Sequence, residues 1–318
     1  MQRFLVQRVL LLAPTLFLAS LLVFGIIALA PGDPARMRLG TEATADEVAA
    51  ERARLGLDQP VPVRYVIWLS DVAHLNLGKS QVNGRPVVNL VLEAFPNTLR
   101  LALSALLLSV LVGFPLGMLA AVNRNGRLDF FVTGLASLGL SIPSFWLGIL
   151  LILLFSVTLR WLPPSGVGDP SQPFWTYLTY LILPVTTIAF SNLAVFSRFV
   201  RSSMIDVLSA DYVRTARAKG LNERLVVTRH ALRNALIPVV TILGIQVGRL
   251  LGGAVVTEAV FSYPGIGRLV VTSILNRDYP VVQATLMLVV IIFLLTNLLV
   301  DVSYVYLDPR VKLGGAGS

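Results

Sequence analysis

The amino-acid sequence predicts an all-α membrane protein with about six transmembrane helices. Three observations predict this fold class: an apolar composition, six long apolar stretches and an uneven distribution of basic residues. Of the 318 residues, 55% are hydrophobic and 14% are charged, whereas roughly 25% are charged in an ordinary soluble domain. The mean hydropathy of +0.77 agrees with this composition. Lipid is therefore the main solvent for this chain.

The apolar stretches are long enough to cross a bilayer. The hydrocarbon core is about 30 Å thick and needs roughly 20 mainly apolar residues per helix. We expect spans at 9–30, 98–122, 131–159, 177–197, 236–256 and 281–304. The first apolar run also resembles a signal peptide, but it exceeds the usual length of about 7 to 15 residues, so we expect it to remain as a span. An even number of spans places both termini on one side.

The basic residues predict which side that is. The segments on the side of the termini carry 14 of the 26 Lys and Arg, namely Arg3, Arg8, Arg124, Arg127, Arg198, Arg201, Arg214, Arg217, Lys219, Arg224, Arg229, Arg233, Arg310 and Lys312. The two short loops on the opposite side carry only Arg160, Arg268 and Arg277. By the positive-inside rule, both termini are expected in the cytoplasm.

These spans divide the chain into two expected parts. Residues 1–97 form an N-terminal span and a long extracytoplasmic loop with short helices, and residues 98–318 form a five-span core with a cytoplasmic loop at 198–235. In the first part, Thr44-Ala45-Asp46-Glu47 has the pattern of a capping box and predicts a short helix. The stretch Val61–Leu77 mixes aromatic and polar residues, which predicts a helix that lies on the membrane surface or packs on the spans.

Several classes of function are excluded by what the sequence lacks. It has no Cys, and its only two His are His74 and His230, so neither a thiol nucleophile nor a His-rich metal centre is expected. It also lacks the Gly-x-x-x-x-Gly-Lys-[Ser/Thr] phosphate loop and a nucleophile-elbow motif. The net charge of +9 follows membrane topology rather than a nucleic-acid-binding face. We expect no enzyme activity, catalytic residue, cofactor, metal or nucleic-acid partner for this chain, so energy must come from partner subunits.

The cytoplasmic loop 198–235 is the most informative segment. It holds eight basic and three acidic residues and is too long for a simple hairpin. Asp211–Lys219 reads as a short helix, with an acid at its start, a base at its end and Gly220 as a left-handed terminator. Asn222 then caps a second helix toward Leu232. The small side chains of the first helix form a stripe beside basic ones, which we expect to let another protein approach closely: Val213, Ala216 and Gly220, with Arg214, Arg217 and Lys219.

The residues of this loop resemble a known family. Tyr212–Leu221 and Arg229–Pro238 are similar to the coupling loop of ABC importer permeases of the dipeptide, oligopeptide and nickel class. The resemblance implies that a short helix docks in a groove of an ATPase subunit, through Asp211, Tyr212, Val213, Arg214, Thr215, Ala216, Arg217, Ala218, Lys219 and Gly220. The general Glu-Ala-Ala-x-x-x-Gly signature of such permeases is replaced here by Arg214-Thr215-Ala216 before Gly220, so the glutamate contact is missing.

The resemblance covers essentially the whole chain. It rests on motifs in a fixed order between the spans: Pro31–Pro34, Leu55–Pro60, Asn97–Leu99, Ser141–Phe145, Leu162–Gly166, Phe261–Gly267 and Leu307–Val311. It implies the type I ABC importer permease fold and the first of two paired permeases, as in the DppB and OppB subunits.

The turn between the fifth and sixth spans has two interpretations. In the resembled family this region helps to form the outer gate beneath a docked binding protein, which implies a role for Glu258, Phe261, Tyr263, Pro264, Gly265 and Gly267. The alternative is a plain connector, because Pro and Gly here forbid a regular helix. Glu258 then either meets the binding protein or anchors the loop.

Two polar residues within spans are candidates for the translocation path. A charge at the position of Arg249 costs about 2.5 kcal/mol or more in lipid, so its side chain is expected to face protein or a wet cavity. Asn192 is more typical of an interhelical hydrogen bond than of a ligand contact. Both residues therefore keep a structural and a path interpretation.

The resemblance implies a transport subunit of the bacterial inner membrane that carries short peptides into the cytoplasm. Its implied partners are a second, homologous permease, two ATPase subunits that bind ATP and Mg, and an extracytoplasmic solute-binding protein. A nickel chelate or haem is an alternative cargo. An ion-coupled secondary transporter is expected to show paired intramembrane acids or inverted repeats, which this sequence does not display. A purely structural scaffold is disfavoured by the elaborate basic loop.

Overall fold

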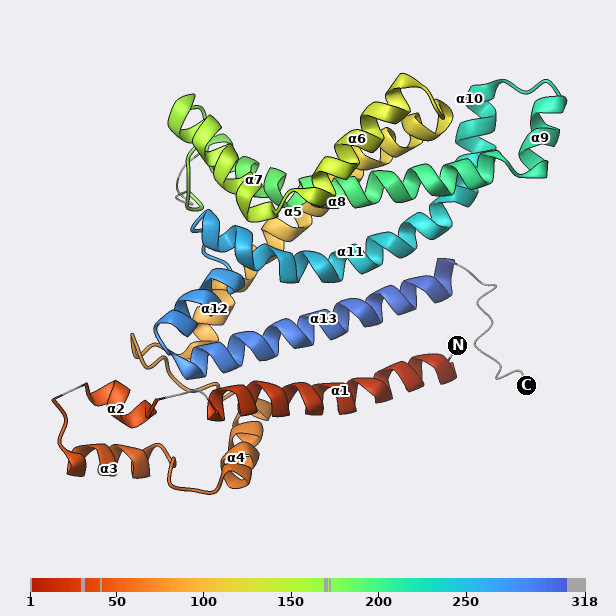
Figure 1. Ribbon diagram of the computed structural model, residues 1–318. Helices are drawn as coiled ribbons and strands as arrows, with labels where there is room; N and C mark the ends of the chain where they lie inside the picture. Colours follow the sequence, from red (N-terminus) through yellow and green to blue (C-terminus); the bar gives the residue numbers. More distant parts are fainter. Residues whose placement is uncertain (1, 30–31, 41, 169–170, 172, 308–318) are drawn as a thin grey trace. The chain divides into compact units, whose positions relative to one another are not determined.

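The fold is built mainly from long helices. The computed structural model describes residues 2–29, 32–40, 42–168, 171 and 173–307. Within these residues the regular secondary structure is helical, apart from one isolated bridge between Lys79 and Pro86 (Figure 1). The long helices are α1 (Gln2–Ala28), α5 (Val87–Val122), α8 (Phe174–Leu208), α11 (Leu232–Val260) and α13 (Tyr279–Leu307). The predicted all-α class is confirmed.

Four described helices are individually long and apolar enough to cross a membrane. They are Arg8–Ala28 within α1, α5, α8 and Tyr279–Val300 within α13. Two bent helix pairs also qualify when each counts as one span: α6 with α7, bent by 102°, and the pair that meets between Leu236 and Pro238, bent by 48°. The six predicted spans therefore correspond to four continuous helices and two bent ones.

The third predicted span is not a single straight helix. It consists of α6 (Arg127–Ser141), α7 (Ser144–Leu151) and a π-helical continuation, η1 (Ile152–Thr158). The break follows from Pro143, because proline disfavours the helical region for the residue before it. Ile142 is accordingly extended, with φ −83° and ψ 121°. The span predicted at 131–159 therefore corresponds to a bent pair of helices.

Two other features differ from the expected spans. Helix α8 continues to Leu208 rather than ending at residue 197, because hydropathy marks the apolar part of a helix and not its polar extension. The segment between α11 and α13 contains an additional helix, α12 (Ile266–Leu275), where only a turn was expected.

The loop that follows α1 contains three short helices, α2 (Pro34–Leu39), α3 (Ala45–Arg54) and α4 (Val61–Ala73). The predicted capping box is present: the Thr44 hydroxyl accepts from the Glu47 amide, and the Glu47 carboxylate accepts from the Thr44 amide. Helix α4 packs on α1, where Tyr65 hydrogen-bonds Ser20 at 2.8 Å and the rings of Trp68 and Phe24 are 5.6 Å apart. This matches the alternative in which this helix packs on a span.

The described chain separates into two compact units. One comprises residues 2–5, 96–268 and 293–307, and the other comprises residues 6–95 and 269–292. The predicted division at residue 97 lies near one of these boundaries, but the second unit also contains α12 from Leu269 onward and the first half of α13. The coupling loop and the turn after α11 both belong to the first unit.

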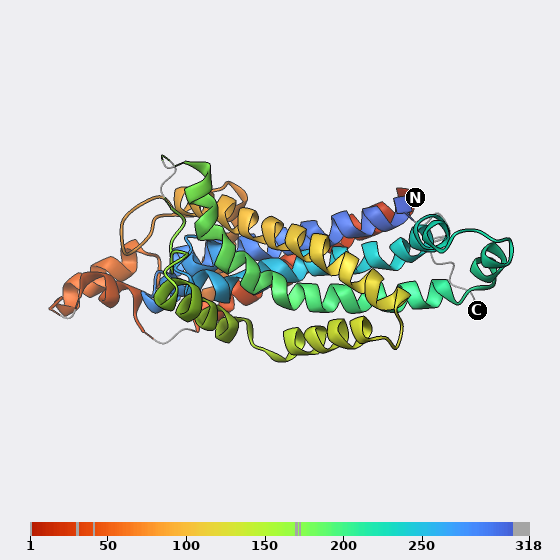
Figure 2. The ribbon, with the colours of Figure 1, turned by 90° about the horizontal axis from the view of Figure 1, so that it is seen from above.

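Helix α8 is central to the first unit, where it packs against α6, α7 and α11 (Figure 2). Glycines allow the closest approaches to it. A Cβ added at Gly117 of α5 would lie 2.5 Å from the Ser197 carbonyl oxygen, and one added at Gly139 of α6 would lie 2.7 Å from the Ala194 Cβ. Small residues of this kind let membrane helices pack backbone to backbone.

Candidate functional site

The predicted coupling helix is present as α9 (Asp211–Ala218). It follows the end of α8 and is connected through α10 (Glu223–Leu225) and the π-helical turn η2 (Val226–Ala231) to α11 (Figure 1). Gly220 terminates it with φ +75°, in the left-handed region that favours glycine. The Asn222 side chain accepts from the Arg224 amide and caps the next helix, as predicted.

The small-residue stripe of α9 faces its own chain. Val213 is fully buried and Ala216 is 6% exposed, and both pack with Val226 against Val207 and Leu208. The sequence analysis expected this stripe to face another protein, and for Val213 and Ala216 that expectation was wrong, because both side chains face their own chain. Amphipathic periodicity identifies an apolar face but not the surface that covers it.

Polar contacts also hold α9 to the neighbouring segments. Arg217 donates to the Glu223 carboxylate through Nη2 at 2.7 Å and through Nε at 3.0 Å. The Asn234 amide donates to the Tyr212 hydroxyl at 2.9 Å. The loop is therefore a small folded unit rather than a flexible tether.

The opposite face of α9 is exposed and polar. The side chain of Arg214 is 71% exposed and that of Asp211 is 98% exposed, with 3.5 Å between their charged atoms. Tyr212 is 44% exposed. Thr215, Ala218 and Lys219 are exposed as well. These residues form the surface that α9 offers to a partner.

The turn after α11 is organised by Glu258, a fully buried carboxylate. Its Oε1 accepts from the Thr98 hydroxyl at 2.7 Å, and its Oε2 accepts from the amides of Gly267 and Arg268 at 2.7 and 3.1 Å. Those amides belong to the first turn of α12, where N–H groups have no partner within the helix and where a negative charge is favourable. Glu258 thus caps α12 from the end of α11, and this arrangement favours its anchoring interpretation.

The rest of this turn is tightly packed. Phe261 and Tyr263 are 1% and 0% exposed, and burial raises the pKa of the Tyr263 hydroxyl. The Asn97 amide donates to the Pro264 carbonyl at 2.9 Å. A Cβ added at Gly265 would overlap the Glu258 carboxylate, and one added at Gly267 would overlap the Val255 backbone. The sequence therefore needs glycine at both positions for space.

The two candidates for the path are placed differently. The Asn192 carbonyl accepts from the Gln246 amide at 2.8 Å, which links α8 to α11, and its own amide donates to the Ile188 carbonyl. This is the interhelical bond expected of the structural alternative. Position 249 lies within α11, but the side chain of Arg249 lies outside the described part of the structure.

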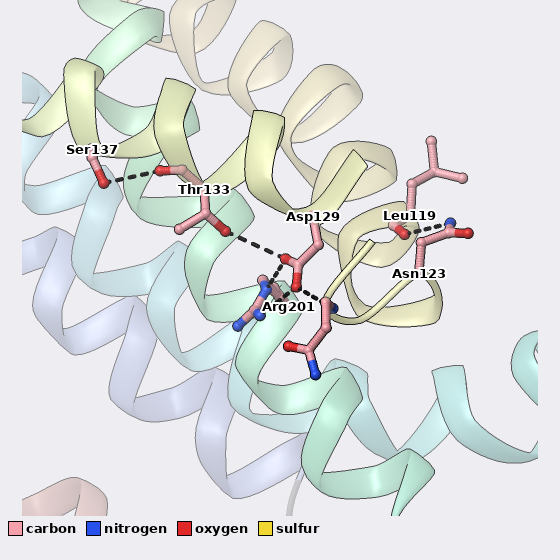
Figure 3. A network of polar contacts seen from close by, with 7 residues as sticks. Leu119, Asn123, Asp129, Thr133, Ser137 and Arg201 are labelled. Atoms are coloured by element: carbon pink, nitrogen blue, oxygen red, sulfur yellow. Dashed lines mark hydrogen bonds and ion pairs between the residues drawn. The ribbon is translucent and has the colours of Figure 1, made fainter. Parts of the chain in front are cut away.

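One polar cluster was missed by the sequence analysis. Asp129, 4% exposed at the start of α6, accepts from Nε of Arg201 in α8 and, at 2.7 Å, from its Nη2 (Figure 3). The same carboxylate accepts from the backbone N–H of Asn125 at 2.9 Å and from the Thr133 hydroxyl at 3.3 Å. The sequence analysis used Arg201 only as a basic loop residue that indicates membrane orientation. The signal that could have revealed the pair is Asp129, an acidic residue directly before the apolar run of α6.

Comparison with known proteins decides the family. Residues 113–313 match the family described as binding-protein-dependent transport system inner membrane component, and residues 1–102 match the N-terminal region of such membrane components. This chain belongs to that family of transport permeases. It is 45% identical over 312 residues to the glutathione transport system permease protein GsiC of Escherichia coli strain K12, covering 98% of this chain and 99% of GsiC. The same identity and coverage hold for GsiC of Salmonella typhimurium strain LT2.

Solved structures agree on the fold of this permease. An inward-facing structure of the MetNI methionine ABC transporter superposes with a TM-score of 0.60 at 19% identity, covering 70% of this chain and 98% of that chain. A crystal structure of an amino acid ABC transporter with histidines gives a TM-score of 0.53 at 13% identity, covering 69% and 94%. The predicted family and fold are thus confirmed.

The permease is a membrane component of an ABC importer. Its family works with ATPase subunits and with a binding protein, and ATP hydrolysis is carried out by the separate ATPase subunits. Its apolar helices and its family place it in the inner membrane. The sequence-based expectations on these points are confirmed.

Proposed function

We propose that this permease translocates short peptides, such as a tripeptide of the glutathione class, into the cytoplasm. The observation that carries the proposal is the 45% identity to GsiC, which extends over 98% of this chain. A relative of the same length and family is expected to share the path along which cargo moves. A nickel chelate and haem are the alternative cargoes within the same importer class.

The proposed assembly contains a second, homologous permease, two ATPase subunits that bind ATP and Mg, and an extracytoplasmic binding protein. Cargo moves along the interface of the two permeases. ATP binding closes the ATPase pair, and α9 transmits this movement so that the cavity switches from inward-facing to outward-facing. The binding protein supplies most of the cargo selectivity.

The coupling role belongs to Asp211–Gly220, and the structure refines how this segment would dock. Because Val213 and Ala216 are covered by their own loop, the groove of the ATPase would receive the exposed face with Tyr212, Arg214 and Lys219. This face carries cations, so an acidic groove on the ATPase is the complementary surface.

The outer gate remains a second part of the proposal. The turn Phe261–Gly267 is rigid because hydrogen bonds fix it at three points: Phe261 accepts from the Gly166 amide, Pro264 accepts from Asn97, and the Gly267 amide donates to Glu258. A rigid turn can form a gate whose movement follows the helices to which it is tied. Glu258 acts in this proposal by holding the turn in place, and Asn192 and Arg249 remain candidates for the path.

Transport by the purified complex tests the proposal. Proteoliposomes that contain both permeases and the ATPase subunits are loaded with ATP, and the binding protein is added outside with radiolabelled glutathione. ATP-dependent uptake that unlabelled di- and tripeptides compete away supports a peptide importer. Uptake of a nickel chelate or haem, with no competition by peptides, would reassign the cargo.

A further inference from the structure

The cluster around Asp129 and Arg201 lies where movement of the coupling helix enters the transmembrane bundle. Arg201 is seven residues before the last residue of α8, Leu208, which corresponds to about 10 Å along the helix axis. Helix α9 begins three residues after Leu208. Two turns of α8 and the link Ser209–Ala210 therefore connect Arg201 to α9.

The carboxylate of Asp129 connects three pieces of the chain at once. It accepts hydrogen bonds from Arg201 of α8, from the backbone N–H of Asn125 in the turn between α5 and α6, and from the Thr133 hydroxyl of α6 (Figure 3). Asn125 has φ +62°, in the left-handed region of the backbone. The hydrogen bond to the Asp129 carboxylate helps to hold Asn125 in this conformation. One side chain thus ties the turn between α5 and α6, and the start of α6, to α8.

Helix packing alone does not fix the position of α5 and α6 along the axis of α8 in this way. The closest contacts of α5 and α6 with α8 are at Gly117 and Gly139, which present bare backbone to the facing helix. Further along α5, the Ser109 hydroxyl donates to the Ala189 carbonyl of α8 at 3.2 Å. Smooth contacts between small residues let helices approach closely but offer few side chains that resist sliding along the axis. A bidentate arginine–carboxylate pair has a fixed geometry and opposes sliding.

Stability gives a weaker account of this pair. The Asp129 and Arg201 side chains are 6% and 27% exposed, and removing two charges from water offsets much of their attraction. Well-packed apolar residues of similar volume commonly stabilise such a position as well as an ion pair does. A function that requires directionality explains the pair better than stability does.

We propose that Asp129 and Arg201 form a positioning pair that makes the α5–α6 hairpin move together with α8 when the ATPase subunits displace α9. The proposal rests on the coupling role proposed for α9. Neither residue touches cargo or nucleotide in this mechanism. Both act by keeping the cytoplasmic ends of three helices in one rigid body.

The variants that test this pair are Asp129→Asn, which removes the charge, and Arg201→Lys, which keeps the charge but loses the bidentate geometry. The matched control is Glu93→Gln, which breaks the exposed ion pair with Arg85 in the other unit. All are made in the full complex with both permeases, ATPase subunits and binding protein. The readouts are retention of the ATPase subunits, ATP hydrolysis and peptide uptake per ATP.

We expect both variants to retain the ATPase subunits and to hydrolyse ATP near the wild-type rate, while uptake per ATP falls about ten-fold for Asp129→Asn and less for Arg201→Lys. Glu93→Gln should couple normally. Normal uptake per ATP in Asp129→Asn would overturn the proposal. An equal fall in hydrolysis and uptake also overturns it, because uptake per ATP is then unchanged.

A distance measurement separates this proposal from the assignment of cargo. The chain has no Cys, so spin labels at Leu128→Cys in α6 and Ser202→Cys in α8 report only on this pair of helices; both positions are exposed. With wild-type Asp129 the distance should be the same without nucleotide and with trapped ATP, and with Asp129→Asn it should change between these states. An unchanged distance in the variant overturns the proposal, even if the cargo proves not to be a peptide.

Discussion

The buried carboxylate of Glu258 shows how much a single residue determines in this protein. It satisfies the Thr98 hydroxyl and two amides at the start of α12. Glu258→Ala should lower the free energy of unfolding by about 3 kcal/mol, because hydrogen bonds to a charged group are lost and buried donors remain without partners. Thermal unfolding of the detergent-solubilised complex measures this. Thr98→Ser keeps the hydroxyl and serves as the control, and an equal loss in both variants would contradict the network.

Glycine positions give a second prediction at this scale. A Cβ at Gly267 would overlap the Val255 backbone, whereas a Cβ at Gly134 of α6 meets nothing within 4 Å. Gly267→Ala should therefore destabilise the protein by about 1 to 3 kcal/mol through overpacking. Gly134→Ala should be neutral or stabilise by about 1 kcal/mol, because alanine favours helix. Equal melting temperatures for the two variants would show that the turn after α11 yields more easily than its packing indicates.

Elements that depend on local chemistry were predicted well from the sequence. The capping box at Thr44 and Glu47, the terminator Gly220 and the cap Asn222 are interactions within a few residues, and all three are present. Elements that depend on tertiary packing were not. The inward direction of Val213 and Ala216 depends on Val207, Leu208 and Val226, which lie outside α9 and fold back onto it.

In the candidate site, too, local features were predicted from the sequence and tertiary contacts were not. The position of α9 was predicted because its charges and terminator are local signals, whereas the Asp129–Arg201 pair joins residues 72 positions apart. Such a pair leaves no periodic pattern in a single sequence. Glu258 was identified as a candidate, but its partner Thr98 lies 160 positions away and was not.

The two faces of α9 have different consequences when mutated. Arg214→Ala changes a side chain that is 71% exposed, so stability should change by no more than about 0.5 kcal/mol. Ala216→Trp adds bulk between α9 and its own loop and should destabilise the loop by about 1 to 3 kcal/mol. If the exposed face docks on the ATPase, Arg214→Ala should weaken retention of the ATPase subunits during purification while the permease melts normally. Full retention would remove Arg214 from the coupling surface.

At the scale of the whole molecule, the orientation in the membrane remains a prediction from charge. The 14 basic residues on one side and the three on the other favour a cytoplasmic position for α9 and an external position for the loop between η1 and α8. Because the chain has no Cys, single variants at exposed positions in these two segments, Lys219→Cys and Ser165→Cys, each carry one thiol. A maleimide that does not cross membranes should label Ser165→Cys in intact spheroplasts, whereas Lys219→Cys should react only after the membrane is permeabilised. Helix α8 is the candidate span between these two positions, so the result tests whether α8 crosses the bilayer. Labelling of both variants on the same side would mean that α8 does not cross the bilayer, and the predicted topology would be wrong.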